Sequence, residues 1–538
     1  RPIIYNWGSN PLVKNNTFSG TGWIRLHGDN LIFENNTNNP SDSLYIYYYG
    51  DNGVIKNNTF LGTSGSINLG CNNPDYQCDI NWWNENYKGP QIAYNNTVYN
   101  NYLATGTSTA ISSYDSHNLT IFNNTFTNAR TAINSYNITD HKIFNNKITV
   151  SNLSANSYAL GIAGINVEIY QNTIRDCNNY CILAASGDLK MIENINIYNN
   201  YITNLTGISG IQIGSGVGSQ SSSINIYENV IEGGWYIDEP EQRAFRGIGA
   251  FGFSSYSEIP SNVQIYGNHI TDVIDGIWLR DTGPSNQQLS GGESWTIQNN
   301  NFSNVLNGIA INGKGTTLYS NLLIRNNIIN LNSSMLCDIC FRKDTGITLV
   351  NTRSLNIENN IIQNPKQGIH IEESQGILII NNIVNNTLEG LTSTGSSLVV
   401  NSNTFKGYCI DSSCLKVSFV KVGDIGLNIS DGSEIELNNN YITNYYTNIN
   451  LEESEITAMY LNELNFSYYG ISASDAKLDI ISNYINYTTE ALNLIETEIN
   501  INGLIINTFE KGIFIFNSSL NIENIEMDDG NLCIEMID

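Results

Sequence analysis

Positive charge is scarce in this sequence. The 538 residues hold 24 Lys plus Arg against 50 Asp plus Glu, so the formal net charge is -26 at pH 7. A chain this acidic repels the phosphate backbone of nucleic acids and the surface of anionic lipids. We therefore expect no nucleic-acid partner. Only 14% of the residues are charged, which leaves polarity mainly to Asn, Ser, Thr and Tyr.

Long apolar runs and helical patterns are also missing. No stretch reaches the roughly 20 consecutive apolar residues that a transmembrane helix needs. Apolar residues recur with a period of two, Val, Ile, Tyr and Thr dominate, and no segment sustains a helical period with caps. The sequence therefore predicts an all-β protein without a membrane span.

One phrase recurs along almost the whole chain, and it ends on a fixed asparagine, a variable residue and an apolar residue. It reads VKNNTF at 13–18, IKNNTF at 55–60 and IFNNTF at 121–126. The fixed asparagine can be followed through Asn58, Asn96, Asn124, Asn146, Asn172, Asn200, Asn229, Asn268, Asn300, Asn327, Asn360, Asn382, Asn403, Asn440, Asn462 and Asn483. A second phrase, Gly-Ile-x-Ile, recurs at the same interval, as at Gly308 and Gly368.

The repeat step settles at about 22 residues, which fits one coil of three short strands. Apolar residues of each strand point inward, and each coil pairs with the coils above and below. The fixed asparagine fits a bend that needs a left-handed residue, with its amide bonded to the same bend of the next coil. In Asn-Asn-Thr phrases the second asparagine is therefore buried in a ladder and the first faces outward.

We predict a right-handed single-stranded parallel β-helix of roughly 18 to 20 coils, continuous over residues 1–538. Insertions interrupt the regular repeat spacing near 71–89, 231–261, 282–295 and 333–345. These loops leave the stem, so the individual features of this protein are expected there.

The nine cysteines form four close pairs and one remainder. The pairs are Cys71 with Cys78, Cys177 with Cys181, Cys337 with Cys340, and Cys409 with Cys414, and Cys533 is left over. Disulfides fit the pairs better than zinc does, because no second ligand pair lies near Cys337-x-x-Cys340. Disulfides indicate an oxidising, extracellular location.

Acceptors for N-linked glycans are spread along the chain and support the same location. The Asn-x-Ser/Thr acceptors are Asn15, Asn35, Asn57, Asn95, Asn118, Asn123, Asn137, Asn152, Asn204, Asn301, Asn332, Asn385, Asn428, Asn465, Asn486 and Asn517.

These repeats resemble the parallel β-helix repeat family, akin to the carbohydrate-binding and sugar-hydrolase repeats of the pectate-lyase-like superfamily. The resemblance covers roughly residues 10–530 and implies a fold rather than one function, since the family includes lyases, hydrolases, epimerases, adhesins and surface proteins. Of the motifs that polygalacturonase-like relatives carry, only an Asp-Asp pair is present, at 528–529. The five scattered histidines and five methionines count against the copper-binding branch. The Gly-x-Gly-x-x-Gly match at 247–252 lacks a βαβ unit, so it predicts no nucleotide site.

One insertion contains carboxylates, guanidiniums and aromatic rings close together in the sequence. Asp238, Glu239 and Arg243 lie in it, and Asp281 follows the Gly276 phrase about one coil later. Paired acids beside aromatic rings suit glycan binding and cleavage. An ion-paired loop that ties the insertion to the stem is the favoured alternative.

Acidic residues also recur after the Gly-Ile-x-Ile strand. They are Glu372, Glu373, Asp431, Glu452, Glu453, Asp475, Glu496 and Glu498. Stacked like charges repel unless calcium, lysine or solvent relieves them. Glu372, Glu452 and Glu496 are therefore candidate calcium ligands, against the alternative of a solvated face, and no cofactor is required.

The scarcity of catalytic motifs favours a structural or adhesive glycoprotein of the cell surface, such as the self-assembling subunit of a filament or layer. A polysaccharide-active enzyme, whether lyase, glycoside hydrolase or epimerase, is the alternative. Little sequence is available for caps, so we expect omitted sequence or another copy, stacked head to tail, to cover the coil ends. Expected partners are thus copies of the chain, other surface proteins and glycans.

Overall fold

The protein is built from short strands and tight bends. The computed structural model describes residues 2–6, 8–62, 65–70, 93–104, 106, 108–150, 158–185, 192–214, 221–234, 246–251, 260–280, 293–313, 319–331, 344–408 and 423–537. None of these residues is helical, and none forms a helix that could cross a bilayer. The chain divides into an N-terminal unit that ends at Val273 and a C-terminal unit that begins at Ile274. The continuous solenoid over residues 1–538 stays a prediction.

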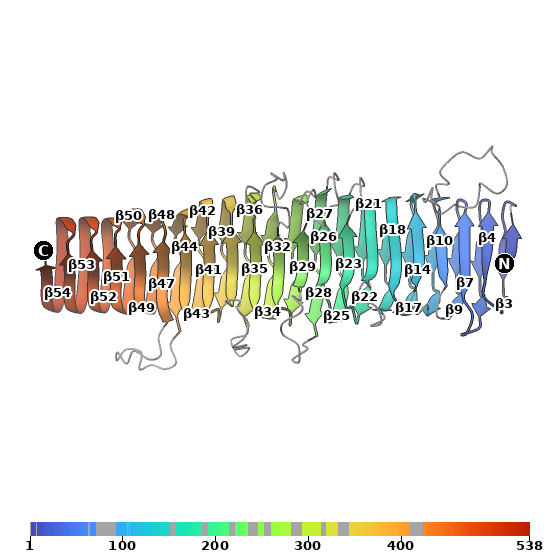
Figure 1. The fold of residues 1–538 in the computed structure, drawn as a ribbon, viewed down its shortest axis with the longest axis horizontal. Helices are drawn as coiled ribbons and strands as arrows, with labels where there is room; N and C mark the ends of the chain where they lie inside the picture. The colour runs from blue at the N-terminus through green and yellow to red at the C-terminus, as the bar shows by residue number, and fades with distance from the viewer. Residues whose placement is uncertain are drawn as a thin grey trace. The chain divides into compact units, whose positions relative to one another are not determined.

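The N-terminal unit stacks its strands in three parallel columns (Figure 1). The first column comprises β1 (Pro2–Asn6), β4 (Gly22–His27), β7 (Leu44–Tyr49), β10 (Ser66–Leu69), β14 (Thr109–Tyr114), β18 (Thr131–Thr139), β21 (Tyr158–Tyr170), β23 (Tyr180–Ala185), β26 (Ser209–Gly214) and β29 (Arg246–Phe251). The second column comprises β2 (Leu12–Lys14), β5 (Ile32–Glu34), β8 (Val54–Lys56), β12 (Thr97–Tyr99), β16 (Thr120–Phe122), β19 (Lys142–Phe144), β24 (Ile192–Tyr198), β27 (Ser221–Tyr227) and β30 (Ser261–Tyr266), with β11 (Ala93–Tyr94) and β15 (Ser116–His117) beside it. The last residues of the long β21 also belong to this column, between β19 and β24. The third column comprises β3 (Thr17–Phe18), β6 (Thr37–Asn38), β9 (Thr59–Leu61), β13 (Tyr102–Ala104), β17 (Thr125–Ala129), β20 (Lys147–Val150), β22 (Thr173–Arg175), β25 (Tyr201–Leu205), β28 (Val230–Gly233) and β31 (His269–Thr271).

The C-terminal unit repeats this arrangement. Its first column comprises β32 (Asp275–Arg280), β35 (Asn307–Asn312), β38 (Thr345–Val350), β41 (Gln367–Glu372), β44 (Glu389–Thr394) and β47 (Gly423–Ser430). Its second column comprises β33 (Thr296–Gln298), β36 (Tyr319–Arg325), β39 (Thr352–Glu358), β42 (Gln375–Ile380), β45 (Ser397–Asn401), β48 (Glu434–Asn438) and β50 (Glu455–Tyr460). Its third column comprises β34 (Asn301–Val305), β37 (Ile328–Leu331), β40 (Ile361–Gln363), β43 (Ile383–Thr387) and β46 (Thr404–Gly407). Longer strands then turn the corners without a break: β49 (Tyr441–Glu452), β51 (Glu463–Ser474), β52 (Lys477–Ile495), β53 (Glu498–Phe516) and β54 (Ser519–Ile537).

An amide ladder runs inside each unit at the bend between the second and third columns. Each ladder asparagine donates its side-chain amide to the side-chain oxygen of the next, at 2.9 to 3.1 Å. The N-terminal ladder is Asn16, Asn36, Asn58, Asn101, Asn124, Asn146, Asn172, Asn200, Asn229 and Asn268. The C-terminal ladder is Asn300, Asn327, Asn360, Asn382, Asn403, Asn440, Asn462 and Asn483. The predicted buried ladder is confirmed.

Two details of the predicted bend are wrong. The left-handed residue is the one before the ladder asparagine: Asn57 has φ 56° and is exposed, whereas Asn58 is buried. A left-handed residue reverses the chain and turns the following side chain inward, so the two roles fall on neighbouring residues. Asn96 is not a ladder member either. Its side-chain oxygen accepts from the Gly53 N–H at 2.6 Å at the preceding bend, and Asn101 takes the ladder position.

Small residues let the C-terminal coils stack closely. The bend before the second column carries a hydroxyl ladder in which backbone N–H groups donate to the next hydroxyl at 3.0 to 3.2 Å. This ladder runs through Thr352, Ser374, Ser396, Ser433 and Ser454. The glycine of the Gly-Ile-x-Ile phrase is required by space, because a Cβ at Gly368 would lie 2.4 Å from both the Gly390 oxygen and Val384.

One predicted insertion contains part of the stem. The segment 231–261 includes β29, which pairs with β26 in the first column. Its Gly247-Ile-Gly-Ala sequence is a variant of the Gly-Ile-x-Ile phrase, with Ile248 and Ala250 buried in the core. This strand was not predicted, because its sequence is rich in glycine. Residues 71–89 lie outside the described residues, as do most of 282–295 and 333–345.

Candidate functional site

A groove crosses the outer face of six neighbouring strands in the C-terminal unit. It has a volume of about 770 Å³ and lies over β36, β39, β42, β45, β48 and β50. Its floor is a row of outward side chains in direct register across five of these strands: Leu323, Asn356, Leu378, Val399 and Glu436.

One wall of the groove carries small side chains at its centre, Ser354, Gly376 and Ser397. Asn321 and Glu434 lie at the two ends of this row. Asn321, Ser354 and Gly376 have φ between 51° and 65°, so the chain turns sharply there. Beyond the last of these positions, Thr457 completes the lining.

The floor is aliphatic at three of its five positions. The matching row of the N-terminal unit also lies four residues before each ladder asparagine. It begins with the aliphatic Leu12, Ile32 and Val54 and continues with the polar Thr97, Thr120, Lys142, Glu168, Asn196, Asn225 and Gln264. Leu323, Leu378 and Val399 are each half-buried and face outward. An outward aliphatic row thus occurs in both units, and in the C-terminal unit it is followed by the carboxylate of Glu436.

A polar cluster lies at the start of β38, β41 and β44. The Gln367 amide donates to Glu389 at 2.8 Å and to the Thr392 hydroxyl at 2.7 Å. Asp344 forms an ion pair with Lys366 at 3.3 Å. Burial raises the pKa of the Asp344 carboxyl, and Lys366 opposes that rise. The cluster therefore joins two carboxylates with hydrogen-bonding partners on neighbouring coils.

His370 lies on β41 beside Thr392 of β44. Its Nε2 is 3.6 Å from a Glu372 oxygen, so an interaction on the surface of the stem accounts for this histidine.

Aromatic side chains gather on β4 and β7 in the N-terminal unit. The Arg25 guanidinium lies 5.1 Å from the Trp23 ring centre and 5.7 Å from that of Tyr47. His27 packs on Tyr49 at 4.8 Å. Burial, and next the charge of Arg25, lower the pKa of His27 to about 4, so this imidazole is neutral at pH 7.

Seven aromatic rings stack along the second strand column of the N-terminal unit. The rings of Tyr99, Phe122, Phe144, Tyr170, Tyr198, Tyr227 and Tyr266 follow one another at 4.8 to 5.0 Å with planes within 7°. Each inner ring is covered on both faces by its neighbours. The column therefore stiffens the stem rather than offering faces on which a sugar could stack.

Asp238, Glu239, Arg243 and Asp281 all lie outside the described residues. Trp278, which lies on β32 and precedes Asp281 in the sequence, is described; it is 7% exposed, with the Arg280 guanidinium 5.6 Å from its ring centre.

The three candidate calcium ligands do not come together. Thr394 and Ser430 occupy the two coils between Glu372 and Glu452. Glu496 lies instead at the bend, with φ 50°, in the row that also holds Glu453 with φ 46°. The predicted acidic column is thus split between strand ends and bend. Within the described ranges, no three acidic, His or Cys side chains are grouped to hold a metal ion.

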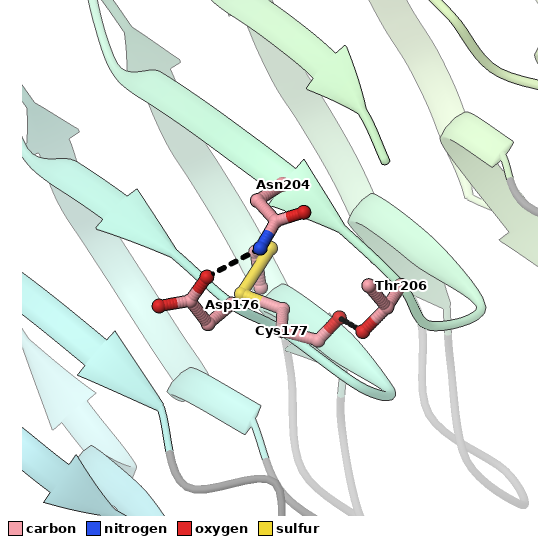
Figure 2. The surroundings of a disulfide bond; sticks show 5 residues. Asp176, Cys177, Asn204 and Thr206 are labelled. Atoms are coloured by element: carbon pink, nitrogen blue, oxygen red, sulfur yellow. Dashed lines mark hydrogen bonds between the residues drawn. A yellow bond between two sulfur atoms is a disulfide. The ribbon is translucent and has the colours of Figure 1, made fainter. Parts of the chain in front are cut away.

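One predicted disulfide is confirmed. Cys177 and Cys181 are bonded, fully buried, and 5.4 Å apart at Cα. Figure 2 shows the disulfide beside Asp176, which accepts from the Asn204 amide at 2.6 Å, and beside Thr206, whose hydroxyl donates to the Cys177 oxygen at 3.2 Å. The pairs Cys71 with Cys78, Cys337 with Cys340 and Cys409 with Cys414 lie outside the described residues. Cys533 is a free, exposed thiol.

Most described glycan acceptors lie on the surface. Exposed ones are Asn15, Asn35, Asn57, Asn95, Asn118, Asn123, Asn137, Asn204, Asn301 and Asn517. Asn385, Asn428 and Asn486 are half-buried, while Asn152 and Asn332 lie outside the described residues. Asn465 is a poor acceptor, because its side chain is 5% exposed and donates to Glu463 at 2.8 Å.

The groove and the aromatic cluster were not predicted. The cluster had a visible signal, since the alternating aromatic and basic residues of 23–27 and 45–49 must face one side of each strand. The groove had none, because its floor joins residues from 323 to 436 whose alignment depends on how each coil is registered with the next.

Comparisons with known proteins address the fold. The family described as "Right handed beta helix region" matches residues 287–423. No curated protein matches the chain. Similar solved structures include XylC with xylose (14% identity, 56% of this chain and 51% of that chain, TM-score 0.31). They also include the PL6 family alginate lyase AlyGC (11%, 100% of both chains, 0.39) and the Yersinia enterocolitica family 28 exopolygalacturonase (12%, 68% and 72%, 0.32).

The chain spans about half the length of the first of these structures. The three likenesses assign neither an activity nor a ligand. The family match and the parallel strand columns agree on the architecture, so this chain is a right-handed parallel β-helix protein.

Proposed function

We propose that this chain is a structural or adhesive extracellular glycoprotein whose β-helix serves as a stiff stem. The proposal rests on the different roles of two neighbouring asparagines at one bend of the coil. The second asparagine bonds each coil to the next inside the stem, and the first displays a glycan acceptor outside it. Asn57 and Asn58 illustrate the pair, with the first exposed and the second 1% exposed. A continuous internal ladder favours rigidity, since every coil depends on its neighbours.

The disulfide supports a location outside the cytoplasm. Cys177 and Cys181 close a short loop in the core, and such bonds persist in oxidising compartments. Attachment to the cell surface and assembly into a filament or layer belong to the proposal too. Light scattering of the purified protein over a range of concentrations tests the assembly, and a constant monomer mass would overturn it.

Glycan mapping of protein from its natural source tests the main proposal. Peptides that contain Asn15, Asn35 or Asn57 are expected to carry N-linked glycans, and the protein is expected in the extracellular fraction. Unmodified acceptors at every exposed position, together with a cytoplasmic protein, would overturn it. A matched control is Asn100, an exposed left-handed residue at the same bend that lacks the acceptor sequence and must stay unmodified.

A polysaccharide-active enzyme is the second candidate, favoured by the polar cluster on β38, β41 and β44. Cleavage of a glycosidic bond needs a protonated acid and a second carboxylate. Asp344 has the raised pKa that suits the acid, and Glu389 is held by the Gln367 amide. A panel of polysaccharides assayed for new reducing ends or unsaturated products tests this function. Activity lost in Asp344→Asn and in Glu389→Gln supports it, and silence across the panel rejects it.

A further inference from the structure

We infer that the groove of the C-terminal unit is a docking site for an extended, lysine- or arginine-bearing peptide segment of a partner protein. This inference goes beyond the proposed stem function, because it names the chemistry of a partner and the surface that takes it. Secretion and glycan occupancy do not depend on it.

The negative charge of the groove favours a positively charged ligand. Among the described residues that line it, the ionisable ones are two acids, Glu434 and Glu436, which lie two positions apart on β48 and both face the groove. The Asn438 amide donates to Glu436 at 2.8 Å and so orients that carboxylate. Glu455 of the next coil is already paired with Lys477 of the coil after it, at 3.1 Å. A chain of net charge -26 further attracts cationic partners.

The floor selects a ligand with aliphatic parts. Leu323, Leu378 and Val399 present half-buried side chains in one row, with the Asn356 amide between the two leucines. Lysine and arginine cover apolar surface with their stems while their charged ends reach a carboxylate. A basic peptide with aliphatic residues therefore matches both the floor and the acidic end.

The shape of the groove fits an extended chain. Six strands at about 4.8 Å from one to the next span about 24 Å, which about seven residues of extended peptide would cover. The flanking strands are hydrogen-bonded on both sides, so a peptide cannot join as an additional strand and must lie across them. The hydroxyls of Ser354 and Ser397 and the amides of Asn321 and Asn356 are placed to bond its backbone.

A glycan fits these contacts less well. Sugar rings stack on aromatic faces, and the described lining of the groove is aliphatic, amide, hydroxyl and carboxylate. The aromatic cluster of Trp23 and Tyr47 around Arg25 lies on other strands, β4 and β7. We therefore assign the groove to a peptide and treat glycan binding as an outcome of the test.

Fluorescence anisotropy with the full chain tests the docking site. The probes are two fluorescein-labelled seven-residue peptides, one alternating leucine with lysine and one alternating leucine with glutamate. The lysine peptide is expected to bind and the glutamate peptide is not. The double variant Glu434→Gln/Glu436→Gln is expected to weaken binding about tenfold at low salt, and Leu378→Ser about fivefold.

A double variant of equal charge separates the groove from general attraction. Glu523→Gln/Glu526→Gln removes two exposed acids of β54, away from the groove, and must leave the affinity within about twofold. An equal loss in this control, or equal binding of the glutamate peptide, would overturn the inference. Displacement of the lysine peptide by a linear neutral hexasaccharide would also overturn it, because the groove would then be a glycan site.

Discussion

The Nε2 of His141 lies 2.9 Å from the hydroxyl oxygen of Ser116, inside the N-terminal unit. The Ser116 hydroxyl also lies 2.5 Å from that of Ser113, and all three side chains are buried. The same bend position holds Leu119 in the preceding coil and Val167 in the following coil. The imidazole of His141 thus occupies a position that the neighbouring coils fill with aliphatic side chains.

This position predicts a pH dependence of stability. Burial lowers the pKa of His141 to about 3, so the folded protein favours the neutral ring. Its stabilising contribution is complete above pH 6.5 and is lost as the pH falls toward 3. From pH 7 to pH 4, the free energy of unfolding should therefore fall by about 3 kcal/mol more in the wild type than in His141→Leu. Urea unfolding at both pH values measures the difference, and parallel pH profiles would contradict it.

The amide ladder predicts a large loss on removing one member. Asn200 donates to the Ile169 oxygen at 2.9 Å and to Asn229 at 3.0 Å, and it accepts from Asn172 at 3.0 Å. Asn200→Ala leaves these buried partners unsatisfied, so we expect a loss of about 4 kcal/mol in unfolding free energy. Asn199→Gly is the control, because it keeps the left-handed bend at an exposed position and should cost under about 0.5 kcal/mol. Similar urea midpoints for the two variants would refute a structural role for the ladder.

The glycine column predicts a steric effect in the C-terminal unit. Gly368→Ala places a Cβ 2.4 Å from the Gly390 oxygen, and a shift of the stacked backbone should cost about 3 kcal/mol. Gly395→Asn is the matched control, since Glu373 and Asp431 already hold left-handed conformations at the same bend. It should change stability by less than about 0.5 kcal/mol. Thermal unfolding monitored by circular dichroism distinguishes the two, and a neutral Gly368→Ala would show that the coils can separate at that point.

Burial predicts which acceptor stays unmodified. In the folded sheet the Asn465 amide accepts from Asn486 at 3.0 Å and donates to Glu463, so a glycan would displace both contacts. We expect a glycan on Asn57 and none on Asn465 in the mature protein, as measured by peptide mass spectrometry. Asn57→Gln should remove one glycan mass, whereas Asn465→Gln should remove none. A glycan found at Asn465 would mean that this part of β51 opens or is modified before it folds.

Short-range pattern was enough to predict the coil. Alternating apolar residues, the Asn-Asn-Thr bend and the Gly-Ile-x-Ile phrase led to the parallel β-helix, the buried ladder and the Cys177–Cys181 disulfide, all of which are confirmed. These features depend on residues a few positions apart, whose side-chain directions follow from strand and bend geometry.

Stacking between coils was decided only by the tertiary structure. It placed Asn101 rather than Asn96 in the ladder, divided the acidic residues between strand ends and bend, and aligned Leu323 with Leu378 in the floor of a groove. The physical reason is that coils differ in length, so the partner of a given side chain lies 20 to 43 residues away along the ladder, and the pairing register alone selects it.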